Sequence, residues 1–206
     1  VGVYPGTAVT GNFAGDITST VEDRTACAAA GLAAWTAGTA MTSGPDMLAE
    51  MGGKTFIPGL YVHASSINIA LANPKVYLDA KGDADAQFIF NVGSTLTTCA
   101  GSEIVLLNGA KAENVFWFLG TALTMGANSL LEGNVLAGSA ITIGTNAKIV
   151  GRAIAQTAVT CETACTVETP TKQYLMESMV VMQVKVNEWT QVLLSQTYIS
   201  PIAVCT

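Results

Sequence analysis

The sequence predicts a mainly β protein, a solenoid of stacked coils with one long α-helix. Residues 55–166 are rich in Val, Ile, Leu and Thr, alternate apolar and polar side chains with period two, and are interrupted by Gly and Asn-Gly turns. Within this stretch a four-residue unit recurs, and short strands repeated at near-constant spacing are typical of coils that stack on one another. Residues 20–41 instead carry apolar side chains at helical spacing.

The recurring unit begins with Ser or Thr and has an aliphatic residue in its third position. It reads SSIN (65–68), STLT (94–97), TALT (121–124), SAIT (139–142) and TAVT (157–160), and an earlier copy, TAVT, stands at 7–10. The last two steps are 18 residues each, whereas the two before them are 29 and 27 residues. We therefore expect main coils over 55–166, the longer ones with extra turns.

The long helix is predicted over 20–41. Glu22 and Asp23 stand in its first turn, where the helix dipole favours acidic side chains. A second, short helix is predicted at 45–51, because Pro45 suits a first turn and the pair Gly52 and Gly53 would end it. We expect one domain over 1–206, in which 169–206 is a C-terminal segment of unassigned role.

Period-two alternation divides each copy of the unit between the core and the surface, because neighbouring side chains of a strand point to opposite faces. The aliphatic third residues should point inward. The second and fourth residues should then point outward, and every one of them is short and uncharged: Ala8, Thr10, Ser66, Asn68, Thr95, Thr97, Ala122, Thr124, Ala140, Thr142, Ala158 and Thr160.

Two interpretations of this outward surface remain open. Threonine is a good strand former, so the pattern is compatible with an ordinary solvated face. An outward face normally collects charged side chains, however, and here they are missing. Strands lie about 4.7–4.9 Å apart and alternate residues about 6.6 Å apart, which gives a grid of methyl and hydroxyl groups comparable to oxygen spacings in ice.

Several segments of the chain resemble the microbial ice-binding proteins. They are VGVYPGTAVTG (1–11), PGLYV (58–62), AQFIFNVGSTLTT (86–98), LLNGAKAENVFWFLG (106–120), EGNVLAGSAIT (132–142) and VGRAIAQTAVT (150–160). The resemblance implies a right-handed β-solenoid of discontinuous coil order with the long helix packed alongside. It also implies adsorption to ice through a flat face, which inhibits ice growth and recrystallisation.

The resemblance also implies a set of site residues. The T-A-x-T motif that carries ice binding in some members of the family maps onto three copies of the unit, and SAIT and STLT are near copies. The candidate ice-binding residues are therefore Thr7, Ala8, Thr10, Ser66, Asn68, Thr95, Thr97, Thr121, Ala122, Thr124, Ser139, Ala140, Thr142, Thr157, Ala158 and Thr160.

Charge and hydropathy exclude several other partners. The net charge is −6 and the nine Lys and Arg residues are scattered, which argues against nucleic acids and anionic membranes. The sequence lacks an uninterrupted apolar run of about 18 residues, so a transmembrane helix is not expected. We expect a monomer without a cofactor, whose partner is the ice surface.

Cysteine usage favours an oxidising compartment. Cys161 and Cys165 lie close enough in sequence for a local disulfide, and a zinc site is the weaker alternative because His63 is the single histidine. We therefore expect a secreted, extracellular protein. No signal peptide is visible at Val1, so a secreted form would be a processed chain.

The main enzymatic alternative is a polysaccharide lyase or hydrolase, since many β-solenoids cleave glycans. Such chemistry needs clustered carboxylates at one position across coils. Asp79, Asp83 and Asp85 form the one acidic cluster, and a solvated loop explains them more simply. A hydrolase triad is disfavoured by the single His63, and a structural role is expected for Arg152. We expect no metal site, no catalytic residues and no enzymatic activity.

A second alternative is a non-catalytic adhesin or surface-binding module that uses the same flat face. The aromatic pair Phe116 and Trp117 lies in the apolar run NVFWFLG, which indicates core or helix-facing positions and not a sugar-stacking platform. Composition does not separate the adhesin from an ice-binding protein, but the growth of ice crystals in a solution of the protein would.

Overall fold

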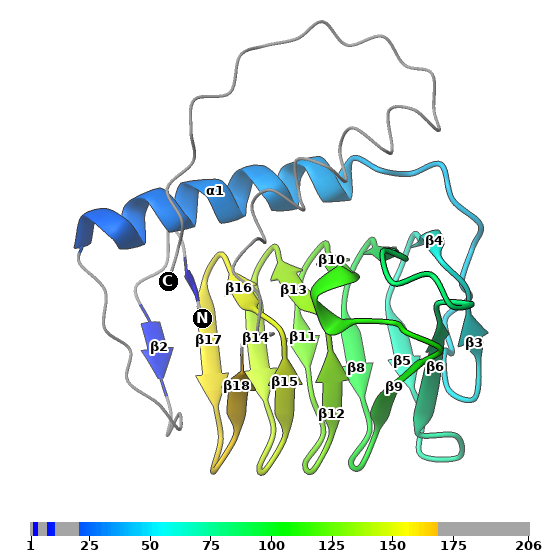
Figure 1. The fold of residues 1–206 in the computed structure, drawn as a ribbon. Helices are drawn as coiled ribbons and strands as arrows, with labels where there is room; N and C mark the ends of the chain where they lie inside the picture. The colour runs from blue at the N-terminus through cyan, green and yellow to red at the C-terminus, as the bar shows by residue number, and fades with distance from the viewer. Residues whose placement is uncertain (1, 4–7, 11–20, 169–206) are drawn as a thin grey trace, which may run out of the picture.

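The computed structural model of the 206-residue chain describes residues 2–3, 8–10 and 21–168, with side chains from residue 29 onward. It forms a solenoid whose coils contribute to three parallel six-stranded sheets, with one long helix alongside (Figure 1). The predicted fold class is confirmed. Thr7 and the segment 169–206 lie outside the described residues.

Each sheet takes one strand from every coil. Sheet A contains β1 (Gly2–Val3), β16 (Ala153–Ala155), β13 (Asn134–Ala137), β10 (Val115–Leu119), β7 (Phe88–Val92) and β4 (Gly59–His63). Sheet B contains β2 (Ala8–Thr10), β17 (Ala158–Cys161), β14 (Ala140–Ile143), β11 (Leu123–Thr124), β8 (Leu96–Thr98) and β5 (Ile67–Ile69). Sheet C contains β18 (Thr166–Glu168), β15 (Lys148–Val150), β12 (Leu130–Glu132), β9 (Glu103–Leu107), β6 (Lys75–Asp79) and β3 (Thr55–Phe56).

The coil order is discontinuous. Strands β1 and β2, from the start of the chain, pair with β16 and β17, while β18 pairs with β15. One coil is thus completed by strands from both ends of the described chain, and α1 (Val21–Thr39) carries the chain back to the opposite end, where β3, β4 and β5 begin the stack (Figure 1).

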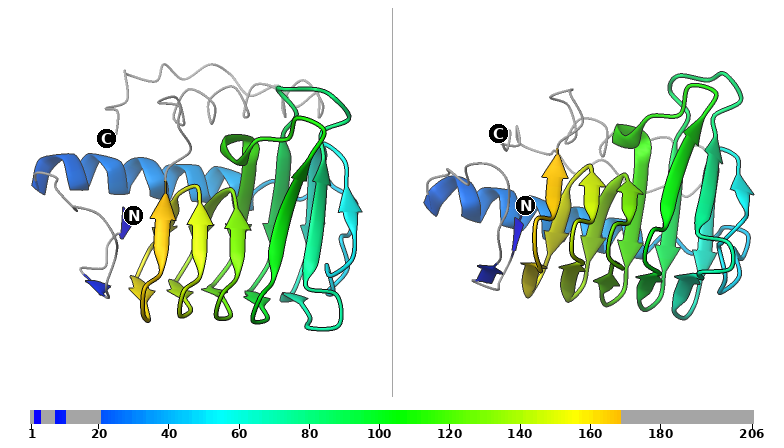
Figure 2. Two further views of the ribbon diagram at one scale, coloured as in Figure 1. Left: turned by 60° about the horizontal axis from the view of Figure 1, so that its bottom comes forward. Right: turned by 90° about the horizontal axis from the view of Figure 1, so that it is seen from below.

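Nearly all of the extra residues of the longer coils lie at one corner, and a single one lies between Ile67 and Val76. Two insertions, 80–87 and 108–114, separate a sheet C strand from the following sheet A strand, and the second contains a 3₁₀ turn at Ala112–Asn114. The loops at the other end of the sheet C strands are short and stacked, as two further views show (Figure 2). The predicted extra turns therefore lie away from sheet B.

Strand β10 is buried on both faces because it lies between the solenoid core and the helix. Trp117 points inward and stacks on Phe90, with ring centroids 4.2 Å apart. Phe116 and Phe118 point to the other side and pack with Trp35 of α1. The predicted core and helix-facing positions of the aromatic run are confirmed, and a continuous apolar run is what a strand buried on both faces requires.

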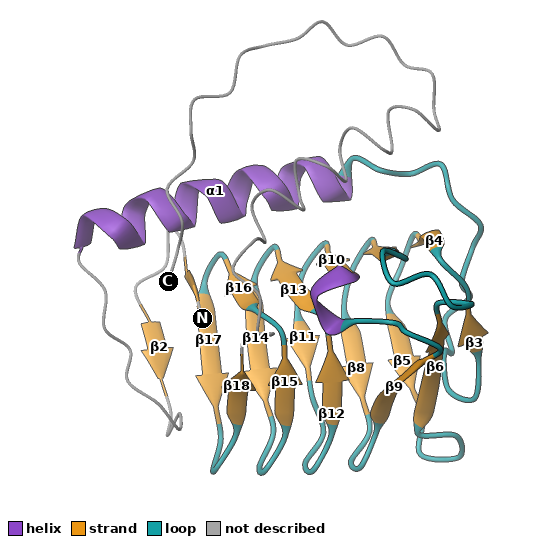
Figure 3. Cartoon of the chain, viewed as in Figure 1, coloured by secondary structure: helices purple, strands orange, loops and turns teal. Residues whose placement is uncertain are grey.

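Helix α1 packs across the outside of sheet A (Figure 3). The indole N–H of Trp35 donates to the carbonyl of Leu119 at 2.8 Å, and the side-chain amide of Asn91 donates to the carbonyls of Thr39 and Met41 at the end of the helix. In the part of the chain that the structure describes, this helix is too short or too polar to cross a membrane, and so is every other one.

The predicted short helix at 45–51 is wrong. This segment is irregular, with Leu48 at a φ of 64°, and it bridges β4 and β5 through the pairs Asp46 with Val62 and Glu50 with Asn68. Met51 is fully buried, so the segment closes this end of the hydrophobic core. The end of a solenoid otherwise exposes unpaired strand edges, and satisfying them outweighs local helix signals.

Candidate functional site

The solenoid has three outer faces, and they differ in what covers them. Sheet A is covered by α1. Sheet C carries charged side chains, among them the ion pairs Lys75–Glu103 and Lys148–Glu168, both at 2.7 Å. The outward positions of sheet B carry no charged residue in β5, β8, β11, β14 and β17. Among the described residues, sheet B therefore offers the one broad face that is both open and uncharged.

Burial follows the predicted alternation along sheet B. The aliphatic third residues of the described copies are at most 1 % exposed and form a continuous inner column: Ile67, Leu96, Leu123, Ile141 and Val159. The outward residues beside them are exposed or half-exposed. We call the outward surface formed by the second and fourth residues of the units, with the Ser or Thr that precedes them, the sheet B face.

Strand register arranges the sheet B face in columns. The fourth residues pair in the order Asn68, Thr97, Thr124, Thr142, Thr160 and Thr10, so five threonines follow one another. In the second position, Ala140 pairs with Ala158 and Ala158 with Ala8. For Ala8 and Thr10 the structure gives the backbone register alone. Parallel pairing sets neighbours in each column about 4.8 Å apart.

Hydroxyl groups at the start of the units face one another across neighbouring coils. The hydroxyl oxygens of Ser139 and Thr157 are 3.5 Å apart, as are those of Ser94 and Thr121. Ser94 was not among the predicted site residues, although it occupies the first position of its unit as Thr121 does. Together, these contacts add a polar column beside the alanine column.

The β5 end of the face is built differently. Thr95 donates its hydroxyl hydrogen to the hydroxyl oxygen of Ser66 at 2.7 Å, and Asn68 ends the threonine column. The side-chain amide of Asn68 donates to a carboxylate oxygen of Glu50 in the capping segment. The regular threonine–alanine pattern thus gives way to a hydrogen-bonded edge.

The acidic residues considered for an enzymatic site lie at the end of β6 and in the loop that follows it, between sheets C and A. Asp79 accepts hydrogen bonds from the ammonium group of Lys81 at 2.8 Å and the amide of Asn108 at 2.7 Å, which lower the pKa of its carboxyl from 3.8 to about 2. Asp83 accepts the backbone N–H of Asp85 at 2.9 Å. These contacts organise a turn, and the described residues contain no group of three or more potential metal ligands.

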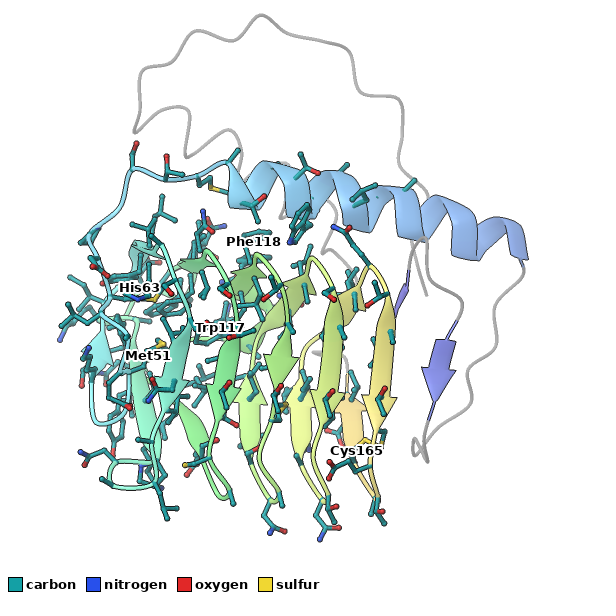
Figure 4. All side chains as sticks on the ribbon, turned by 180° about the vertical axis from the view of Figure 1, so that it is seen from behind. Met51, His63, Trp117, Phe118 and Cys165 are labelled. Carbon is teal, nitrogen blue, oxygen red and sulfur yellow. A yellow bond between two sulfur atoms is a disulfide. The ribbon has the colours of Figure 1, made fainter. Side chains whose placement is uncertain are left out.

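The remaining polar residues considered for catalysis or metal binding do not come together in one site. The Nδ1 atom of His63 lies 2.8 Å from a carboxylate oxygen of Asp46, and this hydrogen bond lowers the pKa of the aspartate. Burial lowers the pKa of Arg152, whose Nη1 atom has no hydrogen-bond partner among the residues that the structure describes. Cys161 and Cys165 form a disulfide at the opposite end of the solenoid from His63 (Figure 4).

Comparison with known proteins identifies relatives of this fold. The family model described as Ice-binding-like matches residues 2–167. An ice-binding protein of Nostoc sp. (strain HG1) is 42 % identical over 88 residues, which are 43 % of this chain and 31 % of that protein. Ice-binding protein 1 of Shewanella frigidimarina is 39 % identical over 89 residues, which are 43 % of this chain and 10 % of that protein. The matched region spans a third or less of these two curated relatives.

Solved structures give the same result over a larger share of the chain. The crystal structure of an ice-binding protein from the Antarctic ascomycete Antarctomyces psychrotrophicus matches with a TM-score of 0.68 and 38 % identity, covering 72 % of each chain. A domain of the Shewanella frigidimarina protein matches with a TM-score of 0.62 and 30 % identity, covering 67 % of this chain and 59 % of that one. Since the family model covers most of the sequence, the chain belongs to the Ice-binding-like family.

Proposed function

We propose that this protein adsorbs to ice through the sheet B face and thereby inhibits ice growth and recrystallisation. The observation that carries the proposal is the difference between the three faces: one is covered by a helix, one is charged, and the sheet B face is neither. Relatives named as ice-binding proteins support the same function.

The physical basis is a rigid array of small groups. Each buried methyl group contributes little, about 0.8 kcal/mol for a group of methylene size. Thr and Ala side chains lose little rotamer entropy when they are immobilised, so the contributions of a stacked array accumulate with a small entropic loss. The hydroxyl groups of the threonine column can donate to and accept from ordered water. Long charged side chains would instead disturb that water layer.

The proposed site comprises the predicted residues together with Ser94. It uses no cofactor, metal or catalytic group, and we propose a monomer that works outside the cell. The Cys161–Cys165 disulfide supports an oxidising compartment. We also propose that the solenoid and α1 form one domain. The closely packed contacts of Trp35 and Phe118 between them support this.

The test is direct observation of a single ice crystal in a solution of the protein held just below its melting point. Faceting and a gap between melting and freezing temperatures are expected. Ala140→Tyr should remove both, because a large ring would stand above the alanine column. Thr55→Tyr on sheet C, which is also exposed, is the matched control and should keep both.

An unshaped, disc-like crystal with the wild-type chain would contradict ice binding and favour an adhesin that uses the same face. Loss of faceting with Thr55→Tyr but not with Ala140→Tyr would assign ice binding to sheet C instead.

A further inference from the structure

The capping segment at the β5 end contains a carboxylate that is bound to the sheet B face. Glu50 lies in the segment 45–51, and its backbone pairs with that of Asn68. The backbone N–H of Met51 donates to the carbonyl of Asn68 at 2.9 Å, and the N–H of Asn68 donates to the carbonyl of Ala49 at 2.7 Å. Edge strand β5 is thus held by β8 on one side and by this short segment on the other.

The side chain of Glu50 adds three hydrogen bonds to these backbone contacts. One carboxylate oxygen accepts the N–H of Gly52 at 2.6 Å and the N–H of Ala70 at 3.1 Å. The other accepts the side-chain amide of Asn68. Both oxygens are therefore engaged, and the Asn68 amide is held in one orientation by a charged acceptor, which makes a stronger hydrogen bond than a neutral one.

We propose that Glu50 is a positioning residue: it holds the Asn68 side chain so that Asn68 is the last ordered member of the threonine column on the sheet B face. The inference rests on the proposed function. Asn68 is in register with Thr97 but has a longer side chain, with two rotatable bonds and an amide that would sample several orientations in water. A held amide extends the ordered polar surface by one coil, whereas a mobile one would end it at β8.

The capping segment itself is anchored independently of this contact. Met47 and Met51 are buried against the end of the core, and the ammonium group of Lys54 donates to the carbonyl of Met47 at 2.9 Å. Met51 and His63 lie together at this end of the solenoid (Figure 4). A change at Glu50 that keeps its shape should therefore leave the cap in place.

The test is Glu50→Gln, which preserves shape and removes the charge. Its carbonyl can still accept from Gly52 and Ala70, but its amide group now donates. The Asn68 amide must then turn over and accept with its carbonyl oxygen, which reverses the donor and acceptor that it offers on the sheet B face. The lowest protein concentration that halts recrystallisation should rise about fivefold, the equivalent of one net hydrogen bond. The side-chain amide resonances of Asn68 should move in a ¹H–¹⁵N spectrum, and the melting temperature should stay near that of the wild type.

Two further variants distinguish positioning from a general effect. In the double variant Glu50→Gln/Asn68→Thr, the introduced hydroxyl accepts from the introduced amide and supplies the group found in the rest of the column, so activity should return. Glu103→Gln removes the same charge from sheet C, where Glu103 pairs with Lys75, and should leave activity unchanged.

Unaltered activity in Glu50→Gln, or a double variant as weak as the single one, would overturn the positioning role while the proposed function stands. If the wild-type chain leaves ice untouched, the proposed function fails, and with it the role of Asn68. The Asn68 resonances would then still report whether the contact exists in solution.

Discussion

Leu123 and Thr124 are neighbours in the two-residue strand β11, yet they should respond to mutation in opposite ways. Leu123 points into the core with none of its surface exposed, and Thr124 points outward and is exposed. Replacing each in turn therefore separates stability from surface function at adjacent positions of one strand.

The variant Leu123→Ala removes a side chain that lies between Leu96 and Ile141 in the inner column. Neighbouring coils are fixed by parallel pairing and collapse only partly into the space. The free energy of unfolding should fall by about 2–5 kcal/mol. For a protein of this size, each kcal/mol corresponds to a fall of about 2–4 °C in melting temperature. Calorimetry measures this directly, and the folded fraction in the cold should still shape ice.

The variant Thr124→Tyr leaves the core untouched, so the free energy of unfolding should change by about 0.5 kcal/mol or less. Its ring would stand above Thr97 and Thr142 in the middle of the threonine column. Thermal hysteresis and inhibition of recrystallisation should be lost, because the flat array can no longer approach ice on either side of the ring. Thr55→Tyr again serves as the control of equal bulk.

If Thr124→Tyr destabilised the protein as much as Leu123→Ala does, Thr124 would not point outward. If folded Thr124→Tyr kept its full activity, the ice-binding surface would lie on another face.

Three further predictions concern the frame that holds the face. Gly38→Ala should lower the free energy of unfolding by about 1–3 kcal/mol, because the new Cβ would lie 2.1 Å from ring atoms of Phe118. A variant as stable as the wild type in thermal unfolding would show that α1 can shift freely. Asn91→Ala should also lower the free energy of unfolding by about 1–3 kcal/mol, because the carbonyl of Thr39 loses its hydrogen-bond donor. An unchanged melting temperature would mean that water replaces the lost donor. Asp79→Asn should make the melting temperature less dependent on pH between 3.8 and about 2. In the wild type, the lowered pKa of Asp79 in the folded state gives a stability that is present above pH 3.8 and is lost as the pH falls through about 2. Parallel curves of melting temperature against pH for the two proteins would contradict this.

The sequence was sufficient to predict the parts of the fold that depend on periodicity. Period-two alternation identified the inward residues, and alignment of the repeated units matched the register of sheet B, because parallel coils place equivalent residues beside one another. The helix was predicted over 20–41 and spans Val21–Thr39. The site residues themselves stay a prediction.

Contacts between segments far apart in sequence were beyond this kind of prediction. Pro45 and Gly52 are local helix signals, but the segment between them pairs with β4 and β5 instead, since the end of the solenoid must satisfy its strand edges. Nothing in the sequence indicated that Glu50 meets Asn68. Ser94 could have been predicted, because it occupies the same position in its unit as Thr121.

The regularity of the sheet B face depends on where the coils vary in length. Along the chain, each inward residue of sheet B follows an inward residue of sheet A by six positions, as in Trp117 and Leu123 or Val135 and Ile141. The next inward residue of sheet C follows after eight positions, as in Leu123 and Leu131.

Both corners that border sheet B are constant in length from residue 96 to residue 167, and the step from Ile67 to Val76 is one residue longer. Nearly all of the variation therefore falls on the third corner, where insertions 80–87 and 108–114 leave the solenoid. A solenoid can therefore accept additional residues without altering the spacing of its threonine column. An insertion into either constant corner would displace one coil of sheet B relative to its neighbours. It should weaken ice binding far more than a longer loop at the third corner does.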